Sequence, residues 1–90
     1  MLVLPAELMH GQATACCRML AQALRSEPGA EAIADASALQ RFDSSALAVL
    51  LDCRREALAA GKSFAVSGMD ARLRALATLY GVAELLPVAD

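Results

Sequence analysis

The residue types that could do chemistry gather in one stretch near the middle of the chain, Asp43-Ser44-Ser45. A carboxylate followed by two hydroxyls can supply a nucleophile when a base lies nearby, can accept a phosphate, or can cap a helix. The apolar spacing that starts at Leu47 favours a helix here, and a helix start presents free N–H groups and a partial positive charge. The stretch is therefore either an ordinary helix cap or a surface at which a phosphate or a partner is read.

Enzymatic chemistry finds little support elsewhere in the sequence. No candidate base stands near the two serines, and the single histidine, His10, is expected in an exposed turn with Gly11. Asp35 and Asp43 could approach each other at adjacent strand ends, but turn and capping roles account for both. The chain has no GxSxG, HExxH or Walker glycine motif. By elimination the sequence predicts a binding or regulatory module with no catalytic residue, no metal and no cofactor.

The three cysteines, Cys16, Cys17 and Cys53, form no CxxC pair. With a single histidine in the chain, they are too few for a Cys/His metal site. We therefore expect small buried hydrophobic side chains in a protein of the reducing cytosol.

Composition bounds the domain count and the partners. Ninety residues allow one domain, taken here as 1–90, and 58% of them are apolar, mostly Ala, Leu and Val. The only aromatic residues are Phe42, Phe64 and Tyr80, the net charge is −2, and no basic run exists, so nucleic acid is a poor candidate partner. The N-terminus lacks a basic segment, and no apolar run approaches the roughly 20 residues of a membrane span, which predicts a cytoplasmic protein without membrane insertion.

The first half of the chain predicts strand, helix, strand. Residues 2–4 form a short apolar strand that Pro5 stops and that residues 6–8 continue. A helix is expected over 12–25, and its apolar stripe consists of Ala13, Cys16, Cys17, Leu20 and Leu24. Residues 31–36 are rich in Ala, which favours a helix, but they are short and follow Pro-Gly, so we expect a buried strand centred on Ile33.

The second half predicts helix, strand, helix and an apolar tail. The strongest helix is expected from Asp43 to about Ala60, with Leu47, Val49, Leu50, Leu51, Arg54 and Leu58 along its core side. A strand over 62–67 follows, and Asp70 is expected to cap a helix over 71–79 whose inner stripe is Leu73, Leu76, Ala77 and Tyr80. The tail over 82–87 packs on the core or adds a short strand. This alternation is typical of an open, largely parallel sheet covered by helices.

The central stretch also carries a family resemblance. Residues 35–47, Asp-Ala-Ser-Ala-Leu-Gln-Arg-Phe-Asp-Ser-Ser-Ala-Leu, resemble the signature of STAS domains, the sulphate transporter and anti-sigma factor antagonist family. Support comes from Leu4-Pro5-Ala6-Glu7-Leu8, which resembles the family's early Gly-Glu-Leu segment, and from Gly61 and Phe64-Ala65-Val66 at the following strand. The resemblance covers nearly the whole chain. It implies a small α/β fold, an open sheet of three to four strands covered by about three helices.

The resemblance also implies a function and a partner. The short length and the ending over 79–87 look most like the small cytoplasmic STAS subunit of phospholipid ABC transporters of the Mla type. That subunit is expected to dock on the transporter's ATPase, to support its assembly and activity without being an enzyme, and to lie peripheral to an inner-membrane complex. The alternative is an anti-sigma factor antagonist in a partner-switching pathway, in which an anti-sigma factor kinase phosphorylates the hydroxyl directly after the Asp, here Ser44.

Both functions use the same surface, the helix opened by Ser44 together with the helix that follows it. The candidate partner-binding residues, which include the candidate phospho-acceptor, are Asp43, Ser44, Ser45, Leu47, Arg54, Arg55 and Arg72, with Arg74 on the same face as Arg72. If Asp43 and Ser44 only cap the helix, their contribution is about 1 kcal/mol of stability and the function lies on another face.

Two departures from the family pattern have physical consequences. Ala46 stands where the family usually has Gly before the Leu, which narrows the space beside Ser44 for a partner. In addition, the chain starts almost directly on the Leu-Pro-x-Glu-Leu segment, so we expect the family's usual first edge strand to be missing. An uncovered strand edge invites pairing with another chain, and a homodimer through that edge is therefore a further expectation.

Overall fold

The computed structural model describes residues 2–89 and has the predicted alternation of strands and helices. The strands are β1 (Leu2–Val3), β2 (Glu7–Leu8), β3 (Glu31–Asp35), β4 (Arg41–Phe42) and β5 (Ser63–Ser67). The helices are α1 (His10–Ser26), α2 (Ser45–Ala59), α3 (Ala71–Leu79) and the short 3-10 helix η1 (Ala83–Leu85).

The described strands form two small sheets, and within each sheet the paired strands run parallel. One sheet has the order β1-β3-β5, with Leu2 opposite Ala34 and Ala34 opposite Val66. The other joins β2 to β4, with Leu8 opposite Phe42. The prediction of an open, largely parallel α/β sheet is confirmed, whereas the expectation that residues 6–8 extend β1 is wrong, because Glu7 and Leu8 pair with β4 instead.

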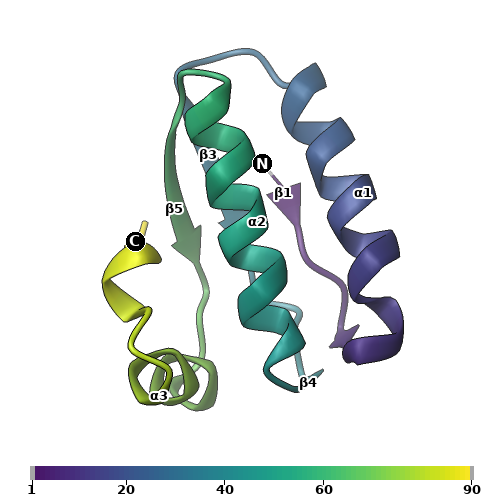
Figure 1. The fold of residues 1–90 in the computed structure, drawn as a ribbon, viewed down its shortest axis with the longest axis vertical. Helices are drawn as coiled ribbons and strands as arrows, with labels where there is room; N and C mark the ends of the chain where they lie inside the picture. Colours follow the sequence, from purple (N-terminus) through teal and green to yellow (C-terminus); the bar gives the residue numbers. More distant parts are fainter. Residues whose placement is uncertain (1, 90) are drawn as a thin grey trace.

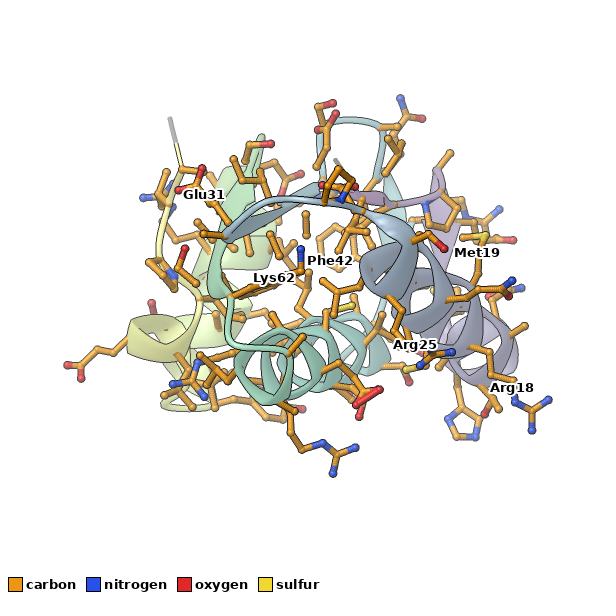
Figure 2. All side chains as sticks on the ribbon, turned by 90° about the horizontal axis from the view of Figure 1, so that it is seen from above. Arg18, Met19, Arg25, Glu31, Phe42 and Lys62 are labelled. Carbon is orange, nitrogen blue, oxygen red and sulfur yellow. The ribbon has the colours of Figure 1, made fainter. Side chains whose placement is uncertain are left out.

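Helices α1 and α2 lie side by side over one face of the three-stranded sheet (Figures 1 and 2). Alternate strand residues point toward these helices and are buried, among them Ala32, Ala34 and Val66. The small strand residues allow the helices to approach closely. Ile33 has the opposite outcome from the prediction: it lies half-buried on the other face, because the period-two alternation directs its alanine neighbours inward.

The core is a single cluster of aliphatic side chains. Its members come from every layer and include Leu2, Leu4, Leu8, Cys16, Leu20, Leu24, Leu39, Leu47, Val49, Leu50, Cys53, Phe64, Leu73 and Leu86. Buried apolar area contributes about 25 cal/mol per Å², so a chain of this size depends on nearly all of these residues for its stability.

Helix α1 begins at His10, two residues earlier than the sequence predicts, so the expected turn at His10 and Gly11 is wrong. The physical reason lies far along the chain, since the Asp43 Oδ2 atom accepts a hydrogen bond from the His10 N–H at 3.1 Å. The Gln12 side chain accepts from the Met9 N–H at 2.9 Å, which satisfies another N–H group at the same helix start.

Two residues expected in the core are exposed. Leu58 is 50% exposed, because Cys53 and Ala57 occupy the core side of the last turns of α2. Tyr80 is 57% exposed, because α3 ends at Leu79 and Tyr80 already belongs to its C-terminal cap. Asp70 caps α3 as predicted, its Oδ1 accepting from the Leu73 N–H at 2.8 Å.

The C-terminal tail both packs and adds strand pairing. Leu86 is buried, and Val88 forms an isolated parallel bridge with Val66. Near the other end of β5, Lys62 precedes the strand, and its Nζ atom donates to the carbonyl oxygens of Glu27 and Gly29, each at 2.7 Å. This lysine ties the connection between α1 and β3 to the start of β5.

Candidate partner-binding site at the start of helix α2

Asp43 joins the starts of the two long helices. Its Oδ1 atom accepts from the Ser45 N–H at 2.8 Å, in the first turn of α2, and its Oδ2 atom accepts from the His10 N–H at 3.1 Å, in the first turn of α1. The predicted capping role of Asp43 is confirmed by the first contact, although α2 begins at Ser45 and not at Asp43. Asp43 is therefore a structural residue that fixes the geometry around Ser44.

The same contacts lower the pKa of the Asp43 carboxyl, chiefly through the N–H of Ser45 and secondarily through that of His10. A carboxyl whose pKa is depressed in the folded state stabilises the fold above its ordinary pKa, and that contribution disappears as the pH falls through the folded-state pKa. The Asp43 carboxylate should therefore stabilise the fold at neutral pH and not in strong acid.

Asp43→Asn should lower the melting temperature at neutral pH, because the amide accepts these bonds without the charge that strengthens them. The difference from the wild type should shrink as the pH falls toward the pKa of Asp43. Thermal unfolding followed by circular dichroism across pH measures both effects. Asp35→Asn is the matched control: the hydrogen bonds of Asp35 are local, to the N–H and the side chain of Ser37 two residues away, so its replacement should lower the melting temperature less. Equal losses in the two variants would contradict the helix-joining role of Asp43.

Ser44 is exposed and stands immediately before the first residue of α2. Its side chain makes no capping hydrogen bond, so the hydroxyl is available at the surface and is not needed for the helix. Ser45 is half-buried, and its N–H is already bonded to Asp43. Of the two hydroxyl residues, Ser44 is therefore the one whose position fits contact with a partner or modification by one.

Arg72 of α3 lies beside Phe42, the residue before Asp43. Its guanidinium carbon is 5.1 Å from the centre of the Phe42 ring, and its Nη2 atom donates to the carbonyl oxygen of Gln40 at 2.9 Å. The same nitrogen lies 3.4 Å from the Asp70 carboxylate, while the side chain keeps 68% of its surface exposed. An exposed cation held by three contacts loses little conformational freedom when a partner binds.

The remaining predicted residues divide between surface and core. Arg55 is exposed and pairs with Asp52 one turn away, and Arg54 is half-buried. Leu47 is buried in the core, so it supports the site without offering a contact surface. The structure thus places Ser44, Arg55 and Arg72 at the surface and assigns Leu47 to packing.

A shallow hollow of about 350 Å³ follows Ser44 along the outer side of α2. It is lined by Ala48, Leu51, Asp52 and Arg55. A separate cavity of about 180 Å³ lies between α3 and the C-terminal tail, away from Ser44. The helical spacing in the sequence assigns Leu51 to the core side of the helix and gives Ala48 no role, so neither residue is predicted as part of the site.

The other residues considered for chemistry have structural roles. Asp35 accepts from the Ser37 N–H at 2.9 Å in a local turn. Cys16 and Cys53 are buried and Cys17 half-buried; burial, followed by the neighbouring thiols, raises the pKa of Cys53 to about 12, which disfavours a reactive thiolate. Within residues 2–89, no three His, Cys, Asp or Glu side chains are arranged to hold a metal ion. The described helices also include none long and apolar enough to cross a bilayer.

Comparison with solved structures identifies the class of fold. The chain superposes on a Thermotoga maritima protein described as an anti-sigma factor antagonist with a TM-score of 0.79 and 16% sequence identity, covering 98% of this chain and 77% of that one. This likeness shows a STAS-type α/β fold. At the level of sequence, the family model described as "Mlab, STAS domain" matches residues 2–87, and the chain belongs to that family. No curated protein shows significant similarity to the chain.

Proposed function

We propose that the chain is a non-enzymatic accessory subunit that binds the ATPase of a phospholipid ABC transporter of the Mla type and supports its assembly and activity. Its membership of the Mlab-type STAS family over residues 2–87 is the observation that carries this proposal. Such a subunit acts in the cytoplasm at the inner face of the membrane and needs a docking surface but no catalytic group.

The surface around Ser44 fits docking on a folded protein. Ser44 is exposed, and the hollow that follows it along α2 is lined by Ala48, Leu51 and Arg55. Arg72 lies separately, over Phe42 beside the start of α2. Interfaces combine an apolar centre with a polar rim and are enriched in arginine, and this surface has that composition. The docking face we propose therefore consists of Ser44 and the outer side of α2, with Arg72 contributed by α3.

Binding to an identified ATPase tests the proposal. The purified chain is titrated into the isolated ATPase subunit of an Mla-type transporter from the same cell, and both complex formation and ATP hydrolysis are measured. A stoichiometric complex with altered hydrolysis supports the proposal, whereas no complex at high micromolar concentration contradicts it. The ATPase of an unrelated ABC importer is the control and should not bind.

The alternative function is that of an anti-sigma factor antagonist controlled by phosphorylation of Ser44. The observation that favours it is the exposed Ser44 hydroxyl, which the helix does not use. A phosphate there would add about −2 charge beside the positive end of α2. Incubation with a candidate anti-sigma factor kinase and ATP, followed by mass spectrometry, would detect that modification, and a Ser44→Ala variant would remove it.

A further inference from the structure

The outer edge of β1 is left without a strand partner in the part of the chain that the structure describes. Sheet order is β1-β3-β5, so β1 pairs on one side only. The Leu4 N–H donates to the Asp35 carbonyl at 2.9 Å, and successive strand residues direct their main-chain groups to opposite sides. Val3 therefore directs its N–H and C=O away from β3, toward solvent.

The side chains beside this edge are apolar and exposed. Val3 is 57% exposed, and Met19 of α1 is 52% exposed. In Figure 2 the Met19 side chain lies at the rim of the molecule beside β1. Ala15 and Ala23, one turn before and after Met19, are also exposed. Val3 lies between the buried Leu2 and Leu4, so its side chain points away from α1 and only its main chain belongs to the edge. We call the main-chain edge at Val3 together with Ala15, Met19 and Ala23 the edge face.

Charge is absent from the edge face. Helix α1 contains no acidic residue, and Arg25 turns toward α2, where it lies 3.8 Å from Glu56. Figure 2 shows Arg18 on the side of α1 away from the sheet. Asp35, the neighbour of Val3 across the sheet, lies one strand further in and already accepts from the Ser37 N–H. Natural edge strands are commonly protected by charged residues, and this one is limited only by Pro5, which follows it.

We infer that the edge face binds a second copy of the same chain. The edge of β1 is self-complementary: in a two-fold arrangement Val3 of each copy exchanges N–H···O=C bonds with Val3 of the other, as in an antiparallel hydrogen-bonded pair. The same symmetry places the two α1 helices next to each other, with Met19 near the axis. Because the edge face is uncharged, two copies meet without like-charge repulsion. The face also carries no charge that would favour an oppositely charged partner of another kind.

The size of the edge sets the strength of the dimer. β1 has two residues and offers few hydrogen bonds, so the α1 side chains supply most of the buried area. Interfaces below about 1,200 Å² are typical of transient complexes, and we therefore expect a reversible, concentration-dependent dimer. Figure 1 places α3 on the opposite side of the molecule from α1, so Arg72 and the outer side of α2 stay accessible in the dimer.

Sedimentation equilibrium over a wide concentration range tests the inference. The wild type should approach twice its 9.4 kDa chain mass at high concentration. Met19→Glu places a charge near the symmetry axis and should raise the dissociation constant at least about tenfold. Leu79→Glu is the matched control: it also replaces an exposed apolar residue on a helix, here 79% exposed, but lies on α3, and it should dimerise like the wild type. Far-ultraviolet circular dichroism verifies that both variants are folded.

Hydrogen exchange gives a second readout that separates this arrangement from other dimers. Exchange of the Val3 amide should slow as the concentration rises, and it should stay fast in Met19→Glu at every concentration. A wild type that stays monomeric, a dimer that Leu79→Glu disrupts and Met19→Glu does not, or a dimer that leaves Val3 unprotected would each overturn the inference. The experiment contains no ATPase, so its result is independent of the proposed function.

Discussion

Ser44→Glu should weaken binding of the ATPase at least tenfold, about 1.4 kcal/mol, while leaving the fold intact. Binding should fall because the new carboxylate would be desolvated against the partner. The fold should tolerate the change because the Ser44 side chain makes no capping bond and a negative charge suits a helix N-terminus. Isothermal titration calorimetry with the purified ATPase measures the affinity, and thermal unfolding measures the stability.

Ser26→Glu is the matched control, because it makes the same chemical change at the last residue of α1. Figure 1 shows the C-terminal end of α1 at the opposite end of the molecule from the start of α2. This variant should bind like the wild type. If Ser44→Glu also binds like the wild type, Ser44 takes no part in docking, Asp43 only holds the two helix starts, and the docking surface must lie elsewhere.

Gly68→Ala should destabilise the fold by about 2–5 kcal/mol, from about 1–2 for the backbone conformation and about 1–3 for overpacking. Gly68 has a φ of +68°, and an added Cβ would lie 2.8 Å from the Ser37 Cβ and 2.9 Å from its Cα and N. These are main-chain atoms and a Cβ, so no side-chain rotation relieves the clash. For a chain of this length the melting temperature should fall by about 10 °C or more.

Gly61→Ala separates the clash from the backbone strain. Gly61 has a φ of +75°, but an added Cβ there meets no atom within 4 Å. It should therefore cost only the strain, about 1–2 kcal/mol. Urea unfolding measures the free energy of unfolding of both variants. Equal losses of this free energy would show that the close approach of Gly68 to Ser37 does not add to the destabilisation. Because Gln40 lies three residues after Ser37 and accepts from Arg72, Gly68→Ala should also loosen the site.

The parts of the fold that local sequence determines could be predicted. Asp70 and Gly61 carry their own signals, an acceptor before a helix and a glycine after one, and both have the expected roles. The strand predicted over 31–36, against the helix propensity of its alanines and because Pro-Gly precedes it, is present over 31–35. The predicted burial of Leu58, Tyr80 and Ile33 is wrong. Periodicity shows which side of a helix or strand is apolar, but it does not show which other element covers that side.

The candidate site was only partly predictable for a similar reason. Asp43 and Ser44 belong to one local motif, so their positions at the start of α2 followed from the sequence. The bond from the His10 N–H spans 33 residues, and the packing of Arg72 over Phe42 joins α3 to β4. Such contacts depend on how the elements are arranged in space, which no periodicity encodes. Strand β4 is missed, and β2 is predicted only as a continuation of β1, because strands of two residues are too short for alternation to show.

The identity of the partner tests the central claim most directly. A tagged chain and its Ser44→Glu variant are isolated from native cytoplasm under mild conditions, and the bound proteins are identified and quantified by mass spectrometry. We predict recovery of the ATPase subunit of a phospholipid ABC transporter with the wild type and its depletion with the variant. Recovery of a small anti-sigma factor kinase in its place, with no transporter ATPase, would contradict the account.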